Sequence, residues 1–369
     1  MRLFLKSFWI RFILIGLAAV GAASVTFFLV ARTAQPDYRP VDAPLSLELS
    51  AAIDKIPKYR RPQESTYLTF PEWYLVFCPQ EYAQFLHGNP PSKFPYFASI
   101  GQFWRGYAQV YGITHRAPFN FGNHLMVMVI GTSSTVEYAI KGVYENTVGR
   151  LFEWTGSGAN TPEDIYATEV AREYGDFIPT QPWFDFPFGH KLAGLWTKTD
   201  FFGPNFLRKC ERKFFLSLEY SVKSVYAGVI RIASHSVYGV ADTEVYASVN
   251  NIPDQAFDNS GVKKVSQLGE HAWIITLPHY EGFTETVPGL AAQGVQFHEI
   301  AGNSEILLTL VAPFAWRYDL AAGKELFTME LLTGPSSKRV AIQVPVKSLG
   351  GLLRETQAKG LRIEHLFDY

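Results

Sequence analysis

The stretch FILIGLAAVGAASVTFFLVA, from Phe12 to Ala31, contains no charged residue and is flanked by Arg11 and Arg32. A helix rises about 1.5 Å per residue, so a helix of this length would cross the roughly 30 Å hydrocarbon core of a bilayer. The stretch therefore predicts a transmembrane anchor in residues 1–32. The side chains expected to contact lipid there include Phe12, Leu14, Leu17, Phe27 and Phe28.

A cleavable signal peptide is the alternative interpretation of this stretch, with a cut after Ala23. Such a cut would leave the apolar segment Val25 to Val30 on the mature chain. The apolar core of a signal peptide is only about 7 to 15 residues long, so an uncleaved anchor is preferred. Lys and Arg are slightly more numerous before the stretch than after it. This bias predicts a single-pass protein of the cell membrane, with a cytoplasmic N-terminus and the body on the outer, periplasmic side.

Composition limits the classes of function. The 369 residues leave room for two domains after the anchor, and aromatic residues are frequent at 15%. A formal net charge of −1 offers no basic surface for phosphates, which argues against a nucleic-acid partner. The two cysteines, Cys78 and Cys210, are far apart, and both one disulfide and two free thiols are compatible with the sequence.

Residues 33–63 contain five prolines among polar residues and are predicted to form a spacer. Helix signals begin at Thr69, Pro71 and Glu72, which suit an N-cap, a first-turn proline and a capping-box acid. Residues 64–250 are predicted to form an aromatic-rich helical domain. Its further helices are expected at about residues 94–111, from 125 to near Trp154, 161–174 and 205–236.

The helix expected over residues 205–236 has two distinct faces. Apolar residues such as Leu218, Val222 and Val225 recur at intervals of three and four. The opposite face carries Lys209, Arg212, Lys213, Lys223 and Arg231. We expect this charged face to lie in solvent, paired with Glu211 and Glu219. Contact of the basic face with anionic lipid is the alternative.

An aromatic segment follows the third of these helices. Prolines interrupt the run Trp183, Phe184, Phe186 and Phe188, which excludes a regular helix. Two interpretations are compatible with such a loop. The rings could pack into the core of the helical domain, or Trp183, Phe184 and Phe186 could enter the headgroup layer of a membrane.

After Ile252 the period of the pattern changes from helical to strand-like. Strands are predicted at 273–277, 295–300, 306–311, 326–332, 340–344 and 361–367, with helices at 283–293 and 349–358. This order fits a small α+β sandwich of ferredoxin-like type over residues 262–369. The predicted fold class is thus α+β, with an N-terminal membrane anchor, a helical bundle domain and this sandwich.

No sequence motif identifies a reaction. The chain has no Gly-x-Ser-x-Gly elbow, no Gly-rich phosphate loop ending in Lys and no His-Glu-x-x-His. Glu137, Lys141 and Glu145 recur every four residues and share one face of the long central helix. They are candidates for acid/base catalysis or for binding a polar headgroup. A ladder of salt bridges along the helix is the preferred alternative.

Four histidines lie on or beside the predicted strands, and they are candidates for a metal site together with Glu299 or Glu364. They are His271, His279, His298 and His365. Their spacing matches no known ligand pattern, so structural or exposed histidines are preferred. No cofactor is predicted.

Two functional hypotheses follow. The first is a non-catalytic envelope protein that is tethered by one helix and binds a membrane surface, a lipid-like ligand or a membrane-protein partner. The second is a membrane-bound enzyme that acts on an apolar substrate with acid/base groups from the central helix. A deep pocket lined by Glu137 and Lys141, with a strongly shifted carboxylate, would favour the enzyme, and a salt-bridged, solvent-facing row would argue against it.

Overall fold

The structure is a computed structural model, and it describes residues 47–369 apart from 116, 118, 156–159, 238–242, 259–260 and 269. The predicted anchor and the first part of the spacer lie outside the described residues. The same holds for the expected lipid contacts Phe12, Leu14, Leu17, Phe27 and Phe28. Among the helices of the described part, none is sufficiently long and apolar to cross a membrane.

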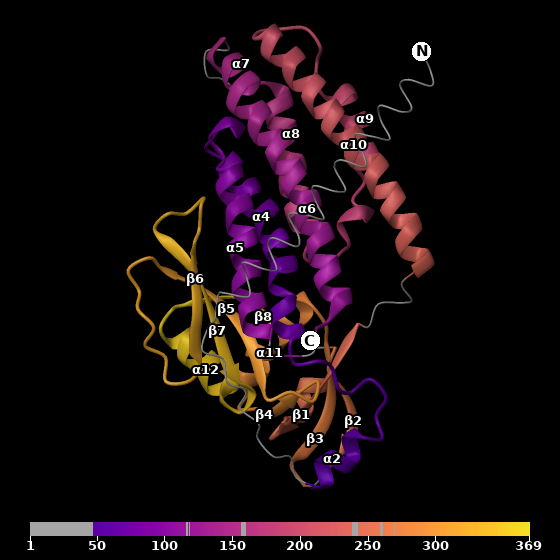
Figure 1. Ribbon diagram of the computed structural model, residues 1–369, viewed down its shortest axis with the longest axis vertical. Coiled ribbons are helices and arrows are strands. Elements are labelled where there is room, and N and C mark those ends of the chain that lie inside the picture. Colours follow the sequence, from indigo (N-terminus) through magenta and orange to yellow (C-terminus); the bar gives the residue numbers. More distant parts are fainter. Residues whose placement is uncertain are drawn as a thin grey trace.

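The described chain begins with a short helix, α2 (Leu47–Ile53), and then forms an elongated helical bundle that rises from two sheets (Figure 1). The bundle contains α3 (Ser65–Leu68), α4 (Phe70–Leu86), α5 (Tyr96–Thr114), α6 (Phe121–Tyr144), α7 (Arg150–Thr155), α8 (Pro162–Phe177), α9 (Phe188–Lys198) and α10 (Phe206–Val237). Two 3₁₀ turns, η1 (Pro91–Lys93) and η3 (Trp183–Asp185), connect helices, and a π-helical turn, η2 (Glu145–Gly149), joins α6 to α7.

Capping residues and prolines predicted the start of α8 correctly and the ends of α4 only in part. The helix start expected at residue 161 is confirmed, and Thr161 and Asp164 exchange side-chain to backbone hydrogen bonds there in a capping box. At α4, Pro71 lies in the first turn as predicted, but Thr69 makes no capping bond. Its hydroxyl donates to Thr66 O at 3.1 Å instead. Pro79 lies inside α4 and does not end it.

The C-terminal part contains two four-stranded antiparallel sheets (Figure 1). The first is built from β1 (Glu244–Asn250), β2 (Lys263–Gln267), β3 (Ala272–Pro278) and β4 (Gln296–Ile300), with α11 (Glu281–Ala292) before β4. The second is built from β5 (Glu305–Pro313), β6 (Lys324–Glu330), β7 (Ser337–Pro345) and β8 (Arg362–Phe367), with α12 (Val346–Ala358) before β8. The strand orders are β2-β3-β1-β4 and β6-β7-β5-β8, so both halves repeat one topology of three strands, a helix and a strand.

The α+β class and the order of helices before sheets agree with the prediction, but two sheets replace the single ferredoxin-like sandwich. The difference arises from two strands that the sequence pattern did not reveal. β1 lies within the range 64–250 that was predicted to be helical, although Val245, Ala247 and Val249 are buried in alternation there. β2 (KKVSQ) is mostly exposed and therefore lacks an apolar period.

Both helices of the repeat, α11 and α12, contribute to one core with the inner faces of the two sheets. The outer face of the second sheet packs against the bundle. There Leu307, Ala341 and Phe367 join Phe70 and other aromatic residues of α3 to α5 in one core. A backbone contact fixes this junction, because Leu307 N donates to the buried Thr66 Oγ1 at 3.0 Å. The bundle and the second sheet thus share a continuous apolar interior.

Candidate functional site

The most distinctive part of the molecule is the layer formed by α6 and α10, which run antiparallel along a common seam. The contacts along this seam are Ser133 Oγ with Tyr226 OH at 3.0 Å, Glu137 Oε1 with Lys223 Nζ at 2.8 Å, Lys141 Nζ with Glu219 Oε1 at 3.0 Å and Glu145 Oε1 with Arg212 Nη1 at 2.8 Å. Residue numbers rise on one helix as they fall on the other. The two helices are therefore paired by polar contacts along the second half of α6 and the middle of α10.

The row Glu137, Lys141 and Glu145, singled out as a candidate site, lies on this seam. Each of its members pairs with a residue of α10, so the row forms an interhelical seam and not a ladder along α6. The Lys141 and Glu219 side chains retain only 13% and 12% exposure. The ammonium group of Lys141 also lies over the ring of Tyr82, at 4.5 Å from its centroid.

Lys141 and Glu219 of the seam hold fixed charges. Burial alone would raise the pKa of Glu219, but the attraction of Lys141 and Lys223 outweighs burial and lowers this pKa well below its usual range. Burial opposes the charge of Lys141 as well, yet its neighbour Glu219 raises the Lys141 pKa. Proton transfer near neutral pH requires a group that titrates there. Neither Lys141 nor Glu219 is poised for it.

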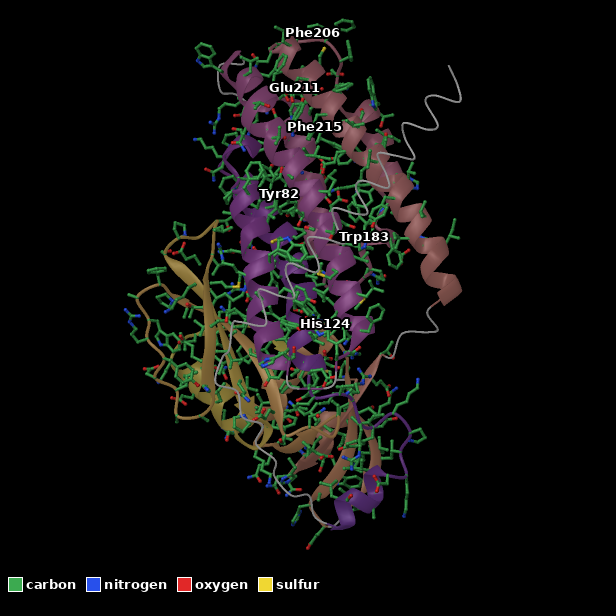
Figure 2. The ribbon with its side chains drawn as sticks, in the orientation of Figure 1. Tyr82, His124, Trp183, Phe206, Glu211 and Phe215 are labelled. Atoms are coloured by element: carbon green, nitrogen blue, oxygen red, sulfur yellow. The ribbon has the colours of Figure 1, made fainter. Side chains whose placement is uncertain are left out.

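A buried charge cluster continues the seam at the end of the bundle far from the sheets, near the labelled Glu211 in Figure 2. We use the name charge cluster for Glu145, Glu163, Asp164, Arg208, Glu211, Arg212 and Lys213, which are all buried or nearly so. Arg208 contacts Glu211 at 2.9 Å and Asp164 at 3.1 Å. Arg212 Nε lies 3.0 Å from the same Asp164 carboxylate.

The π-helical turn positions the cluster on its α6 side. Glu145 is the first residue of this turn and is fully buried, facing Arg212. An extra residue in one helical turn is uncommon and changes the direction of the side chains around it. On the α8 side, burial raises the pKa of Asp164, but the guanidinium groups of Arg212 and Arg208 outweigh burial and lower it. The cluster thus brings four carboxylates and three cations together inside the bundle.

The opposite surface of the same layer is an apolar face. On α6 and its continuation it is formed by Leu125, Val129, Val136, Ile140, Val143, Leu151 and Trp154, and on α10 by Leu207, Phe214, Leu218, Val222, Val225, Val229 and Ile232. All fourteen side chains are exposed, and exposure reaches 85% at Trp154 and 75% at Ile232. Their intervals follow the 3.6-residue period, so each helix presents a stripe.

The two stripes point to the same side of the layer. Val127, Met128 and Gly131 of α6 are buried toward the bundle, as are Leu216 and Tyr220 of α10. Counted at 3.6 residues per turn, the exposed stripe of each helix lies about a third of a turn from the seam residues, on the side away from these buried residues. The prediction that the charged face of residues 205–236 lies in solvent is therefore wrong. Lys209, Arg212 and Lys213 are buried and Lys223 is nearly so, whereas the apolar stripe from Leu207 to Ile232 points outward.

The aromatic segment packs mainly inward. Phe186 is only 4% exposed and belongs to a core with Phe188, so it is not available to lipid. Trp183 and Phe184 are half-buried against the same core. Trp183 also stacks on Tyr226 of α10, with ring centroids 5.3 Å apart, and its position is labelled in Figure 2. Phe186 therefore packs into the core, as the first interpretation expects. Trp183 lies at the border of the apolar face.

The four candidate histidines do not form a metal site among the described residues, where no group of three or more suitable ligands is found. His365 is fully buried and stacks on Trp73, and its Nδ1 lies 2.9 Å from Thr284 Oγ1. His279 pairs with Asp368. His271 is exposed and His298 is half-buried.

Glu72 is a titratable residue whose unusual environment the sequence pattern did not reveal. Glu72 was interpreted only as a helix-start acid, but burial raises its pKa to about 7. The signal that could have identified it is its position as a single charge within the apolar and aromatic run FPEWYLVF. Cys78 is buried and Cys210 is half-buried, and both are free thiols.

No protein-family model, curated protein or solved structure matches this chain, so its function has to be inferred from its own residues.

Proposed function

We propose that this chain is a membrane-tethered, non-catalytic protein whose helical body lies with its apolar face against a lipid surface. The observation that carries the proposal is the inverted layer of α6 and α10, with charges inside and aliphatic side chains outside. Contiguous apolar patches of this extent are unusual on soluble monomers and mark sites of association with membranes or proteins. Polar groups that face the interior of a bundle are the arrangement expected next to lipid.

The proposed anchor supports lipid over other partners for this face. Phe12 to Ala31 has the length and composition of a membrane span. Residues 32–46 join it to α2 and reach at most about 50 Å when fully extended. The body would therefore stay within reach of the bilayer on the side where the chain emerges. With a cytoplasmic N-terminus, that side is the outer surface of the cell membrane.

The alternative of an enzyme with acid/base groups on the central helix receives less support. Its candidate residues Glu137, Lys141 and Glu145 are all engaged in ion pairs with α10. Glu219, the carboxylate that pairs with both Lys141 and Lys223, has a lowered pKa. An acid/base catalyst at neutral pH needs a carboxylate pKa that is raised.

Fluorescence quenching by brominated lipids tests the apolar face in the full chain. The variant V225W places an indole at a position of α10 that is 70% exposed, and F314W places one at a position beside β5 that is 51% exposed. After reconstitution into vesicles, we expect the added fluorescence of V225W to be quenched and that of F314W to persist. Equal, weak quenching of both would contradict contact between the apolar face and lipid.

Alkaline carbonate extraction tests the anchor separately. The full chain is expected to stay in the membrane pellet, because a spanning helix is not removed by high pH. A chain without Met1 to Ala31 retains every described residue and is expected to be extracted. Extraction of the full chain would contradict the single-span anchor without bearing on the apolar face.

A further inference from the structure

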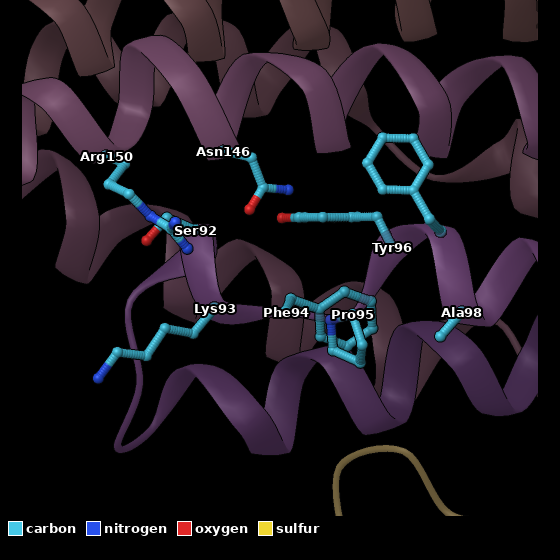
Figure 3. Close-up of a pocket in the computed structure, with 9 residues that line it drawn as sticks. Ser92, Lys93, Phe94, Pro95, Tyr96, Ala98, Asn146 and Arg150 are labelled. Atoms are coloured by element: carbon cyan, nitrogen blue, oxygen red, sulfur yellow. The ribbon is translucent and has the colours of Figure 1, made fainter.

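A pocket opens at the border of the apolar face, between the start of α5 and the π-helical turn. It has a volume of about 380 Å³, and its wall includes Ser92, Lys93, Tyr96, Phe97, Asn146 and Arg150. Figure 3 shows Arg150 and Lys93 at one end of the pocket and Ala98 at the other. This size is at the lower end of the range for small-molecule sites. The pocket thus combines a cationic end with an apolar one.

The two cations of the pocket differ from those of the charge cluster. Arg208, Arg212 and Lys213 are buried and face carboxylates, whereas Lys93 and Arg150 are exposed. Within the described part of the chain, neither Lys93 nor Arg150 forms an ion pair. Cations that no carboxylate neutralises are available to an anion, and a guanidinium group suits the oxygens of a phosphate group.

The wall of the pocket is held in place by its surroundings. Ser92 is buried, and its hydroxyl donates to Glu153, which in turn lies 3.5 Å from Arg208. Asn146 is fixed on the other side, since its Nδ2 donates to Gly142 O at 2.7 Å. Ser92, the neighbour of Lys93 in the wall, is therefore tied to the charge cluster behind it. A preorganised wall reduces the ordering cost of binding.

The pocket is continuous with the apolar face. Phe97 on its wall is 53% exposed, and Leu151, the neighbour of Arg150, is 56% exposed. Close packing joins these helices, because a Cβ placed on Gly142 would lie 3.2 Å from the ring of Phe97. Val143, the next residue, belongs to the apolar face. A ligand with a charged group in the pocket would have its apolar part beside Val143 and Leu151.

We infer that this pocket binds the phosphate group of an anionic phospholipid, with Lys93 and Arg150 as its cationic contacts and the apolar face beside the acyl chains. The inference rests on the proposed function, since it specifies the lipid that the apolar face meets. Lysine and arginine form charge-assisted hydrogen bonds with the oxygens of an anionic headgroup. The pocket adds a defined position for one headgroup to this general attraction.

Isothermal titration of the detergent-solubilised full chain tests the inference with three probes. These are dihexanoyl phosphatidylglycerol, dihexanoyl phosphatidylcholine and inorganic phosphate. We expect phosphatidylglycerol to bind most tightly, and the variant K93Q/R150Q to weaken its Kd about ten-fold or more. Both substituted side chains are exposed, so the variant is expected to fold. The control K263Q/K264Q removes two cations from β2, far along the chain, and should leave the Kd unchanged.

Each other result overturns the inference in a distinct way. Equal affinity for phosphatidylcholine would show that the anionic headgroup is not recognised. Equal affinity for inorganic phosphate would identify a site for a free anion and not for a lipid. An unchanged Kd in K93Q/R150Q would place the lipid elsewhere. The quenching of V225W does not depend on Lys93 or Arg150, so the apolar face can be supported even if the pocket fails.

Discussion

Glu145 and Arg212 meet at 2.8 Å, although their side chains are only 0% and 1% exposed. The pair lies where α6 becomes a π-helical turn, and it joins the polar seam to the charge cluster. Removing two charges from water costs several kcal/mol per ion, and the attraction between them offsets this only in good geometry. The layer of α6 and α10 thus depends on every buried charge having its partner.

The first prediction concerns this pair. E145Q is expected to lower the free energy of unfolding by about 3–5 kcal/mol, because it leaves Arg212 with one partner fewer inside the bundle. The double variant E145Q/R212M should lose less than the sum of the two single variants. Urea unfolding of the detergent-solubilised chain measures both. The exposed pair of Lys263 and Glu244 provides the control, and K263A should cost less than about 1 kcal/mol.

A second prediction concerns Glu219 and acid pH. Its pKa in the folded protein lies below the usual value of 4.5, so its ion pairs stabilise the fold above about pH 4.5, and this contribution is lost as the pH falls further. E219Q lacks this contribution. We expect wild type to exceed E219Q in unfolding free energy by a constant margin from pH 7 to 5, and the margin to shrink below pH 4.5.

A margin between wild type and E219Q that is independent of pH down to 3 would contradict the lowered pKa. The variant E169Q serves as the control, because it removes an exposed carboxylate from α8. It should change the unfolding free energy by less than about 0.5 kcal/mol.

Glu72 is expected to act in the opposite direction. Its pKa is raised from 4.5 to about 7 in the folded protein, so the folded state holds a proton that the unfolded state releases between these values. Stability therefore falls as the pH rises from 4.5 to 7. E72Q has no carboxyl group to ionise, so its stability should not fall over this pH range. Its unfolding temperature should match that of wild type at pH 4 and exceed it at pH 8, and equal differences at both pH values would contradict the raised pKa.

Two glycines in helices give a matched test of packing. A Cβ at Gly131 of α6 would overlap the buried ring of Phe103, whereas a Cβ at Gly228 of α10 would have no heavy atom within 4 Å. G131A is expected to destabilise the fold by about 1–3 kcal/mol through overpacking. G228A should stabilise it by about 0.5–1 kcal/mol through helix propensity. Thermal unfolding measures both, and a stabilising G131A would contradict the close contact of α5 and α6.

Features set by neighbouring residues were predictable from the sequence. Thr161, Pro162 and Asp164 identify the start of α8 because a capping box is a local hydrogen-bond pattern. Most of β3 to β8 follow β-branched and aromatic runs for the same reason. β2 was missed because an exposed edge strand such as KKVSQ has no apolar face.

The orientation of the helices was not predictable in this way. The period of α10 identifies an apolar face and a charged one, but it does not reveal which of them faces the bundle. That choice depends on Glu145 of η2 and Asp164 of α8, which approach α10 only after the chain has folded. For the same reason, Glu137, Lys141 and Glu145 were recognised as one row, while their partners on α10 were not.

The hydrogen bond from Leu307 N to Thr66 Oγ1 has a consequence for how this protein is made. The two residues are 241 positions apart, and a ribosome adds about 5–20 residues per second, so roughly 10–50 s separate their synthesis. During that interval the aromatic rings of α3 and α4 have no sheet to cover them. These uncovered rings make the emerging chain prone to aggregation until β5 arrives.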